Sequence, residues 1–567
     1  MDQRRRSFML QAATGVAATL CGSSAGAVGY GDPGPVGRSD ADIFIERERR
    51  KIQDTMAQNK VEGLAVCFIR DGKPAWVEGF GTTDGSSGRT VDSRTLFSIQ
   101  STSKNFTAAA VMLAVQEGLL DLDAPITTYL PDFAVRSRFE TRPQERITLR
   151  LLLSHRAGFT HEAPVGNNYD PAFPSFEAHV RSISDTWLRF PVGERYRYSN
   201  LGVDLAGYIL QVRTRTSFAK WVEKALFEPL KMADSTFASE TYESSGNRAV
   251  GHQHGHASVP LRTPLIPSGG VYTSARDMAT YALFHLGRGT IEGRSLLRRD
   301  LWQEMHGFAL GGDYSLGVIR SDVRYGTTSL RLLSHKGGGF GFGSVFVYCP
   351  EARMAWAVLF NRAAGACYEL GENLLDGELA NRYGPRAPLL EPERMAAIDP
   401  TPRQLHQFVG NYVSRNTTAD MTLQGDALIK QENDVASNVG FTSPTDVFIV
   451  GADREIAAYR YYPATTEEPA HLECSIGEDS LDFNRGPDDV SGPNKTDWDR
   501  YMGKYYIEQW GIPSLDVTID RSNGYLILNG IRLIVETDRG LFFTVDGEAV
   551  DFRNGKATWK NLRLARR

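Results

Sequence analysis

A proline-rich stretch divides this chain of 567 residues into two parts with different sequence patterns. The stretch, residues 383–403, holds five prolines, which is typical of a linker. Before it, helix-like and strand-like segments both occur, whereas after it only short strands and turns follow. A length of 567 residues also exceeds that of an ordinary single domain. We therefore expect a mixed domain over residues 28–385, a linker over 386–403 and an all-β remainder.

The two ends of the first part each combine a helix with a strand hairpin. A helical pattern runs over residues 39–60, and residues 63–80 alternate as a hairpin around a glycine turn. A second hairpin, SVFVYC and MAWAVLF, surrounds Pro350–Glu351 and precedes a helical stretch over residues 365–383. These segments predict one antiparallel sheet faced by terminal helices, which the helix-rich middle completes into an α+β domain.

Beyond the linker the sequence repeats itself once. The segment FVGNY at residues 408–412 recurs as YMGKY at residues 501–505, and each copy precedes an alternating strand and a glycine turn. The repeat predicts two small antiparallel barrels or sandwiches, over residues 404–486 and 495–567. The expected fold class is therefore an α+β domain, with an antiparallel sheet flanked by helices, followed by two small all-β barrel-like domains.

The first residues are typical of an export signal. Arg4–Arg6 precede a weakly apolar stretch that runs to Leu20, and Ala25–Ala27 follow as a small-residue cleavage site. Residues 5–9 fit a twin-arginine pattern, which an export receptor reads. We therefore predict a twin-arginine-type signal peptide over residues 1–27 and a periplasmic or secreted mature protein. No stretch elsewhere reaches the ~20 apolar residues of a membrane span, so no span is expected.

Charge and composition argue against several classes of function. The formal net charge is −5, and the basic residues 49–51 have glutamates beside them, so no nucleic-acid partner is expected. Four cysteines remain after the signal, too few in so long a chain for a disulfide framework, and their spacing, without CxxC, argues against structural zinc. His252, His254 and His256 could place three imidazoles on one strand face. With no carboxylate or cysteine nearby in sequence, we expect a loop there, and metal ligation is the open alternative.

The strongest local signal is Ser101, followed three residues later by Lys104. The segment FSIQSTSK opens an apolar helix that ends at Gly118. Residues three apart share a helix face, and a helix start favours developing negative charge. Burial would lower the pKa of the lysine, whose neutral amine could then act as a base. Alone, S-x-x-K is a weak signal, because such tetrapeptides occur by chance in long chains.

Two further segments add polar groups to that signal. Tyr198-Ser199-Asn200 leads into a second apolar helix; the tyrosine could relay protons to a leaving group and the amide could orient amine and substrate. The segment SHKGGG, residues 334–339, carries small residues. On an edge strand these would let a substrate backbone pair with the sheet and a backbone N–H point at an oxyanion.

Together the three segments resemble the motifs of the serine β-lactamase-like family, the group of class C β-lactamases, D-aminopeptidases, penicillin-binding proteins and esterases. The motifs Ser101-x-x-Lys104, Tyr198-x-Asn200 and His335-x-Gly337 stand in the family's order and spacing. The resemblance covers roughly residues 40–385, with supporting stretches LLLSHRAGF, LFEPLKMADSTF and PSGGVYTSARDM. The tail of two small β domains is similar to the layout of D-aminopeptidases.

The resemblance implies the catalytic roles. Ser101 would be the nucleophile, Lys104 its activating amine, and Tyr198 the general base and acid. Whether the lysine or the tyrosine takes the first proton stays open, because the two groups titrate as a coupled pair. His155, in LLLSHRAGF, is expected instead to tie a helix end to a neighbouring loop.

The resemblance also implies which groups contact the substrate. Asn200, His335 and Gly337 would bind it, with the histidine orienting the tyrosine or holding the substrate's polar end. The backbone N–H groups of Ser101 and Gly338 would form the oxyanion hole. The H-x-G form departs from the K-T-G of most β-lactamases. A histidine is only partly charged near neutral pH, so the departure puts β-lactamase activity in doubt.

These residues predict a serine hydrolase that cleaves amide or ester bonds through an acyl-enzyme, with no cofactor and a small peptide or ester as its partner. A peptidase for short or D-residue-containing peptides is preferred, because the two β domains could wall off the cleft. Carboxylesterase and β-lactamase or D,D-carboxypeptidase activities are alternatives. A penicillin-binding or peptidoglycan-sensing protein that acylates without turnover is an alternative of another class. The oligomeric state, a homo-oligomer included, stays open.

Overall fold

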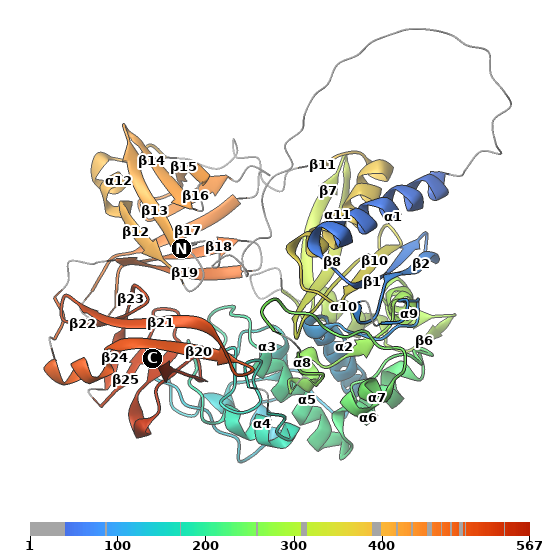
Figure 1. Ribbon diagram of the computed structural model, residues 1–567, viewed down its shortest axis with the longest axis horizontal. Helices are drawn as coiled ribbons and strands as arrows, with labels where there is room; N and C mark the ends of the chain where they lie inside the picture. The colour runs from blue at the N-terminus through green and yellow to red at the C-terminus, as the bar shows by residue number, and fades with distance from the viewer. Residues whose placement is uncertain are drawn as a thin grey trace, which may run out of the picture.

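The computed structural model describes most of the chain from Asp40 to Arg567. The described residues are 40–85, 88–170, 172–256, 259–262, 264–307, 314–387, 398–414, 418–432, 435–450, 456–465, 468–476, 479–486, 491–493, 495–537 and 539–567. The predicted signal peptide, residues 1–27, lies outside them, as do residues 388–397 of the predicted linker. Figure 1 shows a part built of helices and strands beside two groups of strands from the later chain.

Seven strands form one sheet, in the order β11-β7-β8-β9-β10-β1-β2, with antiparallel neighbours throughout. The strands are β1 (Gly63–Arg70), β2 (Lys73–Gly81), β7 (Ile319–Tyr325), β8 (Thr328–Gly339), β9 (Phe342–Cys349), β10 (Met354–Phe360) and β11 (Arg386–Ala387). The predicted hairpins are confirmed as β1–β2 and β9–β10. They also join each other, because β1 pairs with β10 in the register Val66↔Val358.

Helices cover both faces of this sheet. The first and last helices of the domain, α1 (Asp40–Asn59) and α11 (Gly365–Tyr383), confirm the helices predicted at its two ends. Val66 of β1 packs with Ile52 and Leu375 of these helices, whereas its neighbour Cys67 belongs to the core on the other face. The alternation of strand side chains therefore builds two cores from one strand.

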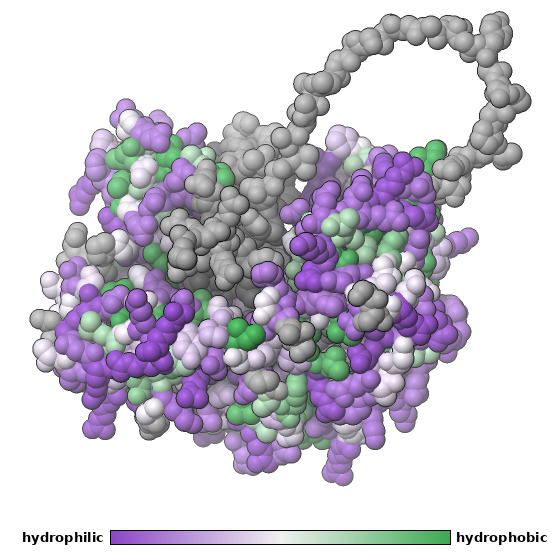
Figure 2. Space-filling model, in the orientation of Figure 1, coloured by the Kyte–Doolittle hydropathy of each residue, from purple (hydrophilic) through white to green (hydrophobic). Residues whose placement is uncertain are grey.

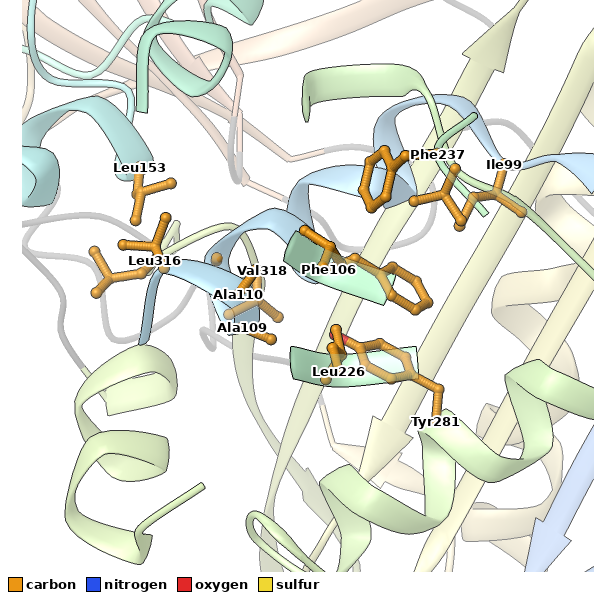
Figure 3. Packing of buried hydrophobic residues seen from close by; sticks show 14 of the residues in the cluster. Ile99, Phe106, Ala109, Ala110, Leu153, Leu226, Phe237, Tyr281, Leu316 and Val318 are labelled. Carbon is orange, nitrogen blue, oxygen red and sulfur yellow. The ribbon is translucent and has the colours of Figure 1, made fainter. Parts of the chain in front are cut away.

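The second face is covered by the helix-rich middle of the chain. Its helices are α2 (Ser103–Gln116), α3 (Leu149–Leu153), α4 (Phe176–Ile183), α5 (Asn200–Thr214), α6 (Phe218–Val222), α7 (Ser239–Ser244), α8 (Ile266–Gly269), α9 (Ala275–Leu286) and α10 (Arg299–Gly307). Residues 103–114 of α2 are all buried, and Phe106 stacks on Tyr281 of α9 with ring centroids 3.7 Å apart (Figure 3). Helix α2 is therefore a core element, held on every side.

The first all-β domain is a closed barrel of eight strands. They are β12 (Gly410–Val413), β13 (Thr418–Gln424), β14 (Ala427–Glu432), β15 (Val435–Phe441), β16 (Asp446–Val450), β17 (Ile456–Tyr462), β18 (His471–Ile476) and β19 (Asp479–Gly486). Pairing of β12 with β19 closes the barrel. Helix α12 (Pro402–Phe408) precedes it and inserts Phe408 into its core, so this domain begins inside the predicted linker.

The second all-β domain consists of two five-stranded sheets, not one closed ladder. One sheet holds β20 (Gly503–Gln509), β21 (Ile512–Ser522), β22 (Tyr525–Leu528), β23 (Ile531–Arg532) and β29 (Ala565–Arg566). The other holds β24 (Ile534–Thr537), β25 (Leu541–Phe543), β26 (Ala549–Asp551), β27 (Thr558–Trp559) and β28 (Leu562–Arg563). Val517 of the first sheet and Phe542 of the second share one core with Trp498.

The sequence repeat corresponds to a repeated local structure. In the first copy the Tyr412 hydroxyl donates a hydrogen bond to the carbonyl of Phe408, at 2.9 Å. In the second copy Tyr505 donates to Tyr501 in the same way, at 2.8 Å. Both tyrosines are buried beneath the start of their domain. The repeat therefore marks the entry of each all-β domain, although the two domains close differently.

The exposed face in Figure 2 is mainly hydrophilic, with hydrophobic residues in small separate groups. This pattern is ordinary for a globular surface. Within the part of the chain that the structure describes, no helix is long and apolar enough to cross a membrane.

Candidate active site

Ser101 is the one accessible residue in a buried segment. From Thr95 to Ala114 every other residue is buried, and Ser101 alone is partly exposed. It lies in a 3₁₀ turn, η2 (Gln100–Thr102), which leads directly into α2. Gln100 before it has a φ of +49°, a left-handed conformation that a non-glycine residue adopts only when its surroundings impose it. The turn therefore presents the serine hydroxyl from an otherwise closed core.

Lys104 lies one turn further along and contacts Ser101 directly. Its side chain is fully buried, and its Nζ lies 3.0 Å from the Ser101 Oγ. The same Nζ also donates to the Asn200 Oδ1, at 2.8 Å, and to the Ser268 carbonyl, at 2.9 Å. The structure therefore brings together Ser101, Lys104 and Asn200, which are separate in the sequence.

Burial changes the acid strength of this lysine. Desolvation lowers the pKa of Lys104 to about 7, although the carboxylates of Asp204 and Glu162 act in the opposite direction. Near neutral pH, a large fraction of the amines is therefore unprotonated. An unprotonated amine 3.0 Å from a serine hydroxyl can accept its proton.

Tyr198 packs over the lysine at the start of α5. Its ring centroid lies 4.8 Å from the Lys104 Nζ, and its ring is partly exposed. The next residue, Ser199, caps α5 by accepting from the Gly202 N–H, and Asn200 begins the helix. The capped helix start therefore fixes the backbone on one side of the tyrosine.

His335 is held by two hydrogen bonds that define its tautomer. Its Nδ1 donates to the Lys336 carbonyl at 2.7 Å, so its Nε2 accepts from the Tyr314 hydroxyl at 2.8 Å. Burial, with the nearby Lys104 charge, lowers the pKa of His335 to about 3, so the ring is neutral. Both ring nitrogens therefore have protein partners. The Tyr198 ring centroid lies 6.4 Å from that of His335.

The strand that carries His335 is not the edge strand that the sequence had suggested for residues 334–339. Strand β8 lies inside the sheet, between β7 and β9. Among the described residues its ladder with β7 ends at Ser334, so residues 335–339 pair with β9 alone. A Cβ at Gly337 would collide with the carbonyl of Ile99. Glycine therefore lets this part of β8 pack against the turn that presents Ser101.

Alternation along β8 sends Lys336 away from His335. The Lys336 Nζ forms an ion pair with Glu372 of α11, on the other side of the sheet from α2. The lysine beside the histidine is therefore engaged outside the candidate site.

Sequence reasoning missed three residues around the tyrosine. Tyr314, which donates to His335, lies in no motif. His161, with a side chain 34% exposed, has its ring centroid 5.8 Å from that of Tyr198, and its Nδ1 lies 2.8 Å from the Glu162 Oε1. Burial raises the pKa of Glu162, but hydrogen bonds from His161 and Asn168 outweigh this effect and leave the pKa lowered. The site therefore includes a carboxylate behind an accessible imidazole.

A buried ion pair supports the segment that binds the lysine. The Asp204 Oδ1 accepts from the Ser268 N–H at 2.9 Å, and Oδ2 lies 3.2 Å from the His179 Nε2. Burial lowers the pKa of His179, but Asp204 outweighs it and the pKa is raised. Asp204 stands alone as a charge in the apolar segment LGVDLAGYIL, a signal that could have singled it out.

His155 has the supporting position expected for it. It follows α3, and its Nδ1 accepts from the Ser199 N–H at 3.2 Å, while its carbonyl accepts from the Arg197 N–H at 3.0 Å. The histidine therefore joins the end of α3 to the loop on both sides of Tyr198.

The three further histidines lie outside this cluster. His252, His254 and His256 line a polar cavity of about 240 Å³ together with Arg362. Within the described ranges, no group of three or more His, Cys, Asp or Glu side chains is arranged to hold a metal ion. The His256 ring instead packs against Trp510, with centroids 5.1 Å apart.

Comparison with known proteins places the first domain. The model of the Beta-lactamase family matches residues 49–380. Protein flp of Staphylococcus aureus (strain COL) is 25% identical over 240 residues, which are 41% of this chain and 47% of that protein. Beta-lactamase-like protein 4 of Dictyostelium discoideum is 27% identical over 252 residues, 42% of this chain and 44% of that protein. The chain spans about half the length of the curated relatives that it matches.

Solved structures share the fold over most of the chain. The octameric penicillin-binding protein homologue from Pyrococcus abyssi aligns with a TM-score of 0.52 and 21% identity, over 78% of this chain and 100% of that one. SurE, solved with D-Leu, aligns with a TM-score of 0.55 and 21% identity, over 78% of this chain and 99% of that one. The aligned share exceeds the first domain, so the likeness in fold extends into the all-β region.

Proposed function

The chain belongs to the beta-lactamase family, and from that membership we propose that it is a serine hydrolase that cleaves amide or ester bonds through an acyl-enzyme on Ser101. One observation carries the proposal. Ser101 is accessible in a buried segment, and its Oγ lies 3.0 Å from an amine whose pKa is lowered to about 7. This pairing of nucleophile and base is what acyl transfer requires.

In the proposed reaction, the Ser101 Oγ attacks the substrate carbonyl while the Lys104 amine takes its proton. The N–H groups of Ser101 and Gly338 donate to the oxyanion that forms. Tyr198, which packs over the lysine, delivers its hydroxyl proton to the leaving group as the bond to the carbonyl carbon breaks, and the proton held by Lys104 then replaces it on the tyrosine. Water then attacks the acyl-enzyme, releases the acid and returns the proton to Ser101. Asn200 holds the lysine in place throughout.

The preferred substrate is a short peptide, D-residue-containing peptides included. The neutral His335 and the outward-facing Lys336 provide no cation at this point of β8 for a substrate carboxylate. The carboxylate of Glu162, behind His161, instead favours a cationic group such as a free amine. These two observations favour an aminopeptidase over a β-lactamase or D,D-carboxypeptidase.

The β20–β21 hairpin supports the restriction to small substrates. At its tip, the backbone N–H of Trp510 donates to the Tyr169 carbonyl at 2.9 Å. The Trp510 ring centroid lies 5.1 Å from that of Phe340. Tyr169 follows His161 along the chain and Phe340 follows β8, so the hairpin tip contacts the segments that come after two residues of the site, His161 and His335. A hairpin that bridges these two segments would favour chain ends over long chains as substrates.

A turnover screen tests the proposal. Protein from residue 28 onward and Ser101→Ala would be assayed with nitrophenyl esters, L- and D-amino acid nitroanilides, short peptides and nitrocefin. Serine-dependent release from anilides or peptides is expected, and the preferred hand defines the peptidase. Release from esters alone would make it a carboxylesterase, and labelling by a fluorophosphonate without turnover would make it a sensor.

We also propose export through residues 1–27 and leave assembly to measurement. Mass spectrometry of the mature N-terminus would show cleavage after Ala27 if the signal is used. Sedimentation would show whether this chain assembles, as the octameric penicillin-binding protein homologue does.

A further inference from the structure

The residues on both sides of Tyr198 are bonded, directly or through one intermediate residue, to the two all-β domains. On one side, the Arg197 guanidinium donates to both carboxylate oxygens of Asp482 on β19, at 3.0 and 3.2 Å. The two side chains are only 7% and 3% exposed. Glu473 of β18 lies 3.5 Å from the same guanidinium. The barrel therefore binds the side chain of the residue immediately before the tyrosine.

On the other side the connection runs to the second all-β domain. The Ser199 hydroxyl donates to the Thr160 carbonyl at 2.6 Å, and the Thr160 hydroxyl donates to the Glu548 carboxylate at 2.5 Å. Glu548 is held in turn by Arg189, at 3.2 Å, which also bonds Asp546 at 3.0 Å. The residue immediately after the tyrosine is therefore linked through Thr160 to that domain.

The charged groups in these links are buried, so each of them requires its particular partner. A buried guanidinium needs its carboxylate, because an unpaired charge away from water is strongly unfavourable. Hydrogen bonds between charged groups are also roughly twice as strong as those between neutral groups. Arg197 and Asp482 lie 285 residues apart, so their contact exists only when the barrel is docked.

We propose that the two C-terminal β domains position Tyr198 for proton delivery, through the Arg197–Asp482 pair and the Ser199–Thr160–Glu548 chain. These are positioning residues, since none of them reaches Ser101. The inference rests on the proposed function. It assigns to the barrel and the second β domain a part in proton delivery by Tyr198, in addition to restricting the size of the substrate.

The leaving group provides the test. Breaking an amide requires a proton on the departing amine, whereas nitrophenolate departs without one. In the full chain, Asp482→Asn should therefore lower kcat for a peptide or anilide by roughly 10- to 100-fold, the scale of a displaced catalytic group. Its kcat for a nitrophenyl ester should fall less than about 3-fold, and fluorophosphonate labelling of Ser101 should keep its rate. Tyr198→Phe should show the same selectivity.

Matched variants separate positioning from folding. Asp446→Asn removes an exposed ion pair with Arg460 on the same barrel and should change neither substrate's rate. Asp482→Glu, which keeps the charge, should restore part of the amide activity. Should Asp482→Asn fail to fold, Thr160→Val breaks the second link without removing a charge and should give the same amide-selective loss.

Two outcomes would overturn the inference: a folded Asp482→Asn that loses both activities equally, or one that loses neither. Failure of the proposed function itself looks different. In that case Ser101→Ala would retain turnover, whatever Asp482→Asn does.

Discussion

The two halves of the candidate active site are held by different parts of the molecule. Ser101 and Lys104 belong to the centre of the first domain, where the buried Thr102 hydroxyl lies 2.9 Å from the Ser344 hydroxyl of β9. Tyr198 lies in a loop whose neighbours are linked to the barrel and to the second β domain. The half that holds Ser101 and Lys104 thus lies inside one core, whereas the half that holds Tyr198 lies where three domains meet.

The difference shows how the proposed hydrolase would position its base and its acid independently of each other. A residue inside a close-packed core moves little without disturbing that core. A loop at a domain junction is only as well placed as the docking of its neighbours. We therefore expect substitutions in the first half to abolish chemistry, and substitutions in the second to change which bonds are cleaved.

The largest effect should come from the proposed nucleophile, Ser101. Ser101→Ala should reduce turnover of every substrate by about 10⁴-fold or more, the scale measured when a serine hydrolase loses its nucleophile. Turnover assays of the purified variant measure this, with the exposed Ser244→Ala as the control. If Ser101→Ala kept its activity, the nucleophile would have to be another residue.

The next effect should come from the amine beside it. Lys104→Met should lower kcat by about 10²- to 10⁴-fold for esters and amides alike, because the proton of Ser101 then has no acceptor. Lys104→Arg should not restore activity, since a guanidinium stays protonated. Circular dichroism would verify folding. An amide-selective loss here would contradict the division between the two halves.

The pH dependence of kcat/KM tests the assignment of Lys104 as the base. The amine must be neutral to act, so kcat/KM should be low in acid and rise through about pH 7, where Lys104 loses its proton. Asp204 raises the pKa of this lysine, so Asp204→Asn should move the rise to lower pH. A profile that starts to rise only near the ordinary lysine pKa would contradict the lowered pKa of Lys104, and with it a neutral amine near pH 7.

The smallest effect concerns the tyrosine half. Ser199→Ala removes the cap of α5 and the bond to the Thr160 carbonyl. It should cost about 1 kcal/mol in the free energy of unfolding, the usual value of an N-cap. Amide turnover should fall several-fold while ester turnover stays near the parent value. Urea unfolding measures the change in stability, and parallel assays measure the two turnover rates. Equal losses of amide and ester turnover would contradict the difference between the two halves of the site.

Much of the fold was predictable because it is local. The helices α1 and α11 and the hairpins β1–β2 and β9–β10 follow from apolar periods and turn residues in single segments. The repeat FVGNY and YMGKY likewise predicted two all-β domains. It could not predict that one closes as a barrel and the other as two sheets, because closure depends on strand pairing over long separations.

The sequence by itself determined the candidate nucleophile, amine, tyrosine and amide, since each stands in a short motif at a helix start. Only the tertiary structure decided what surrounds them. It placed Tyr314 against His335, turned Lys336 away to α11 and joined Arg197 to Asp482. The physical reason is that motif spacing records neighbours along one helix or strand. A buried charge pair or a shared hydrogen bond is fixed by domain docking, which no local pattern contains.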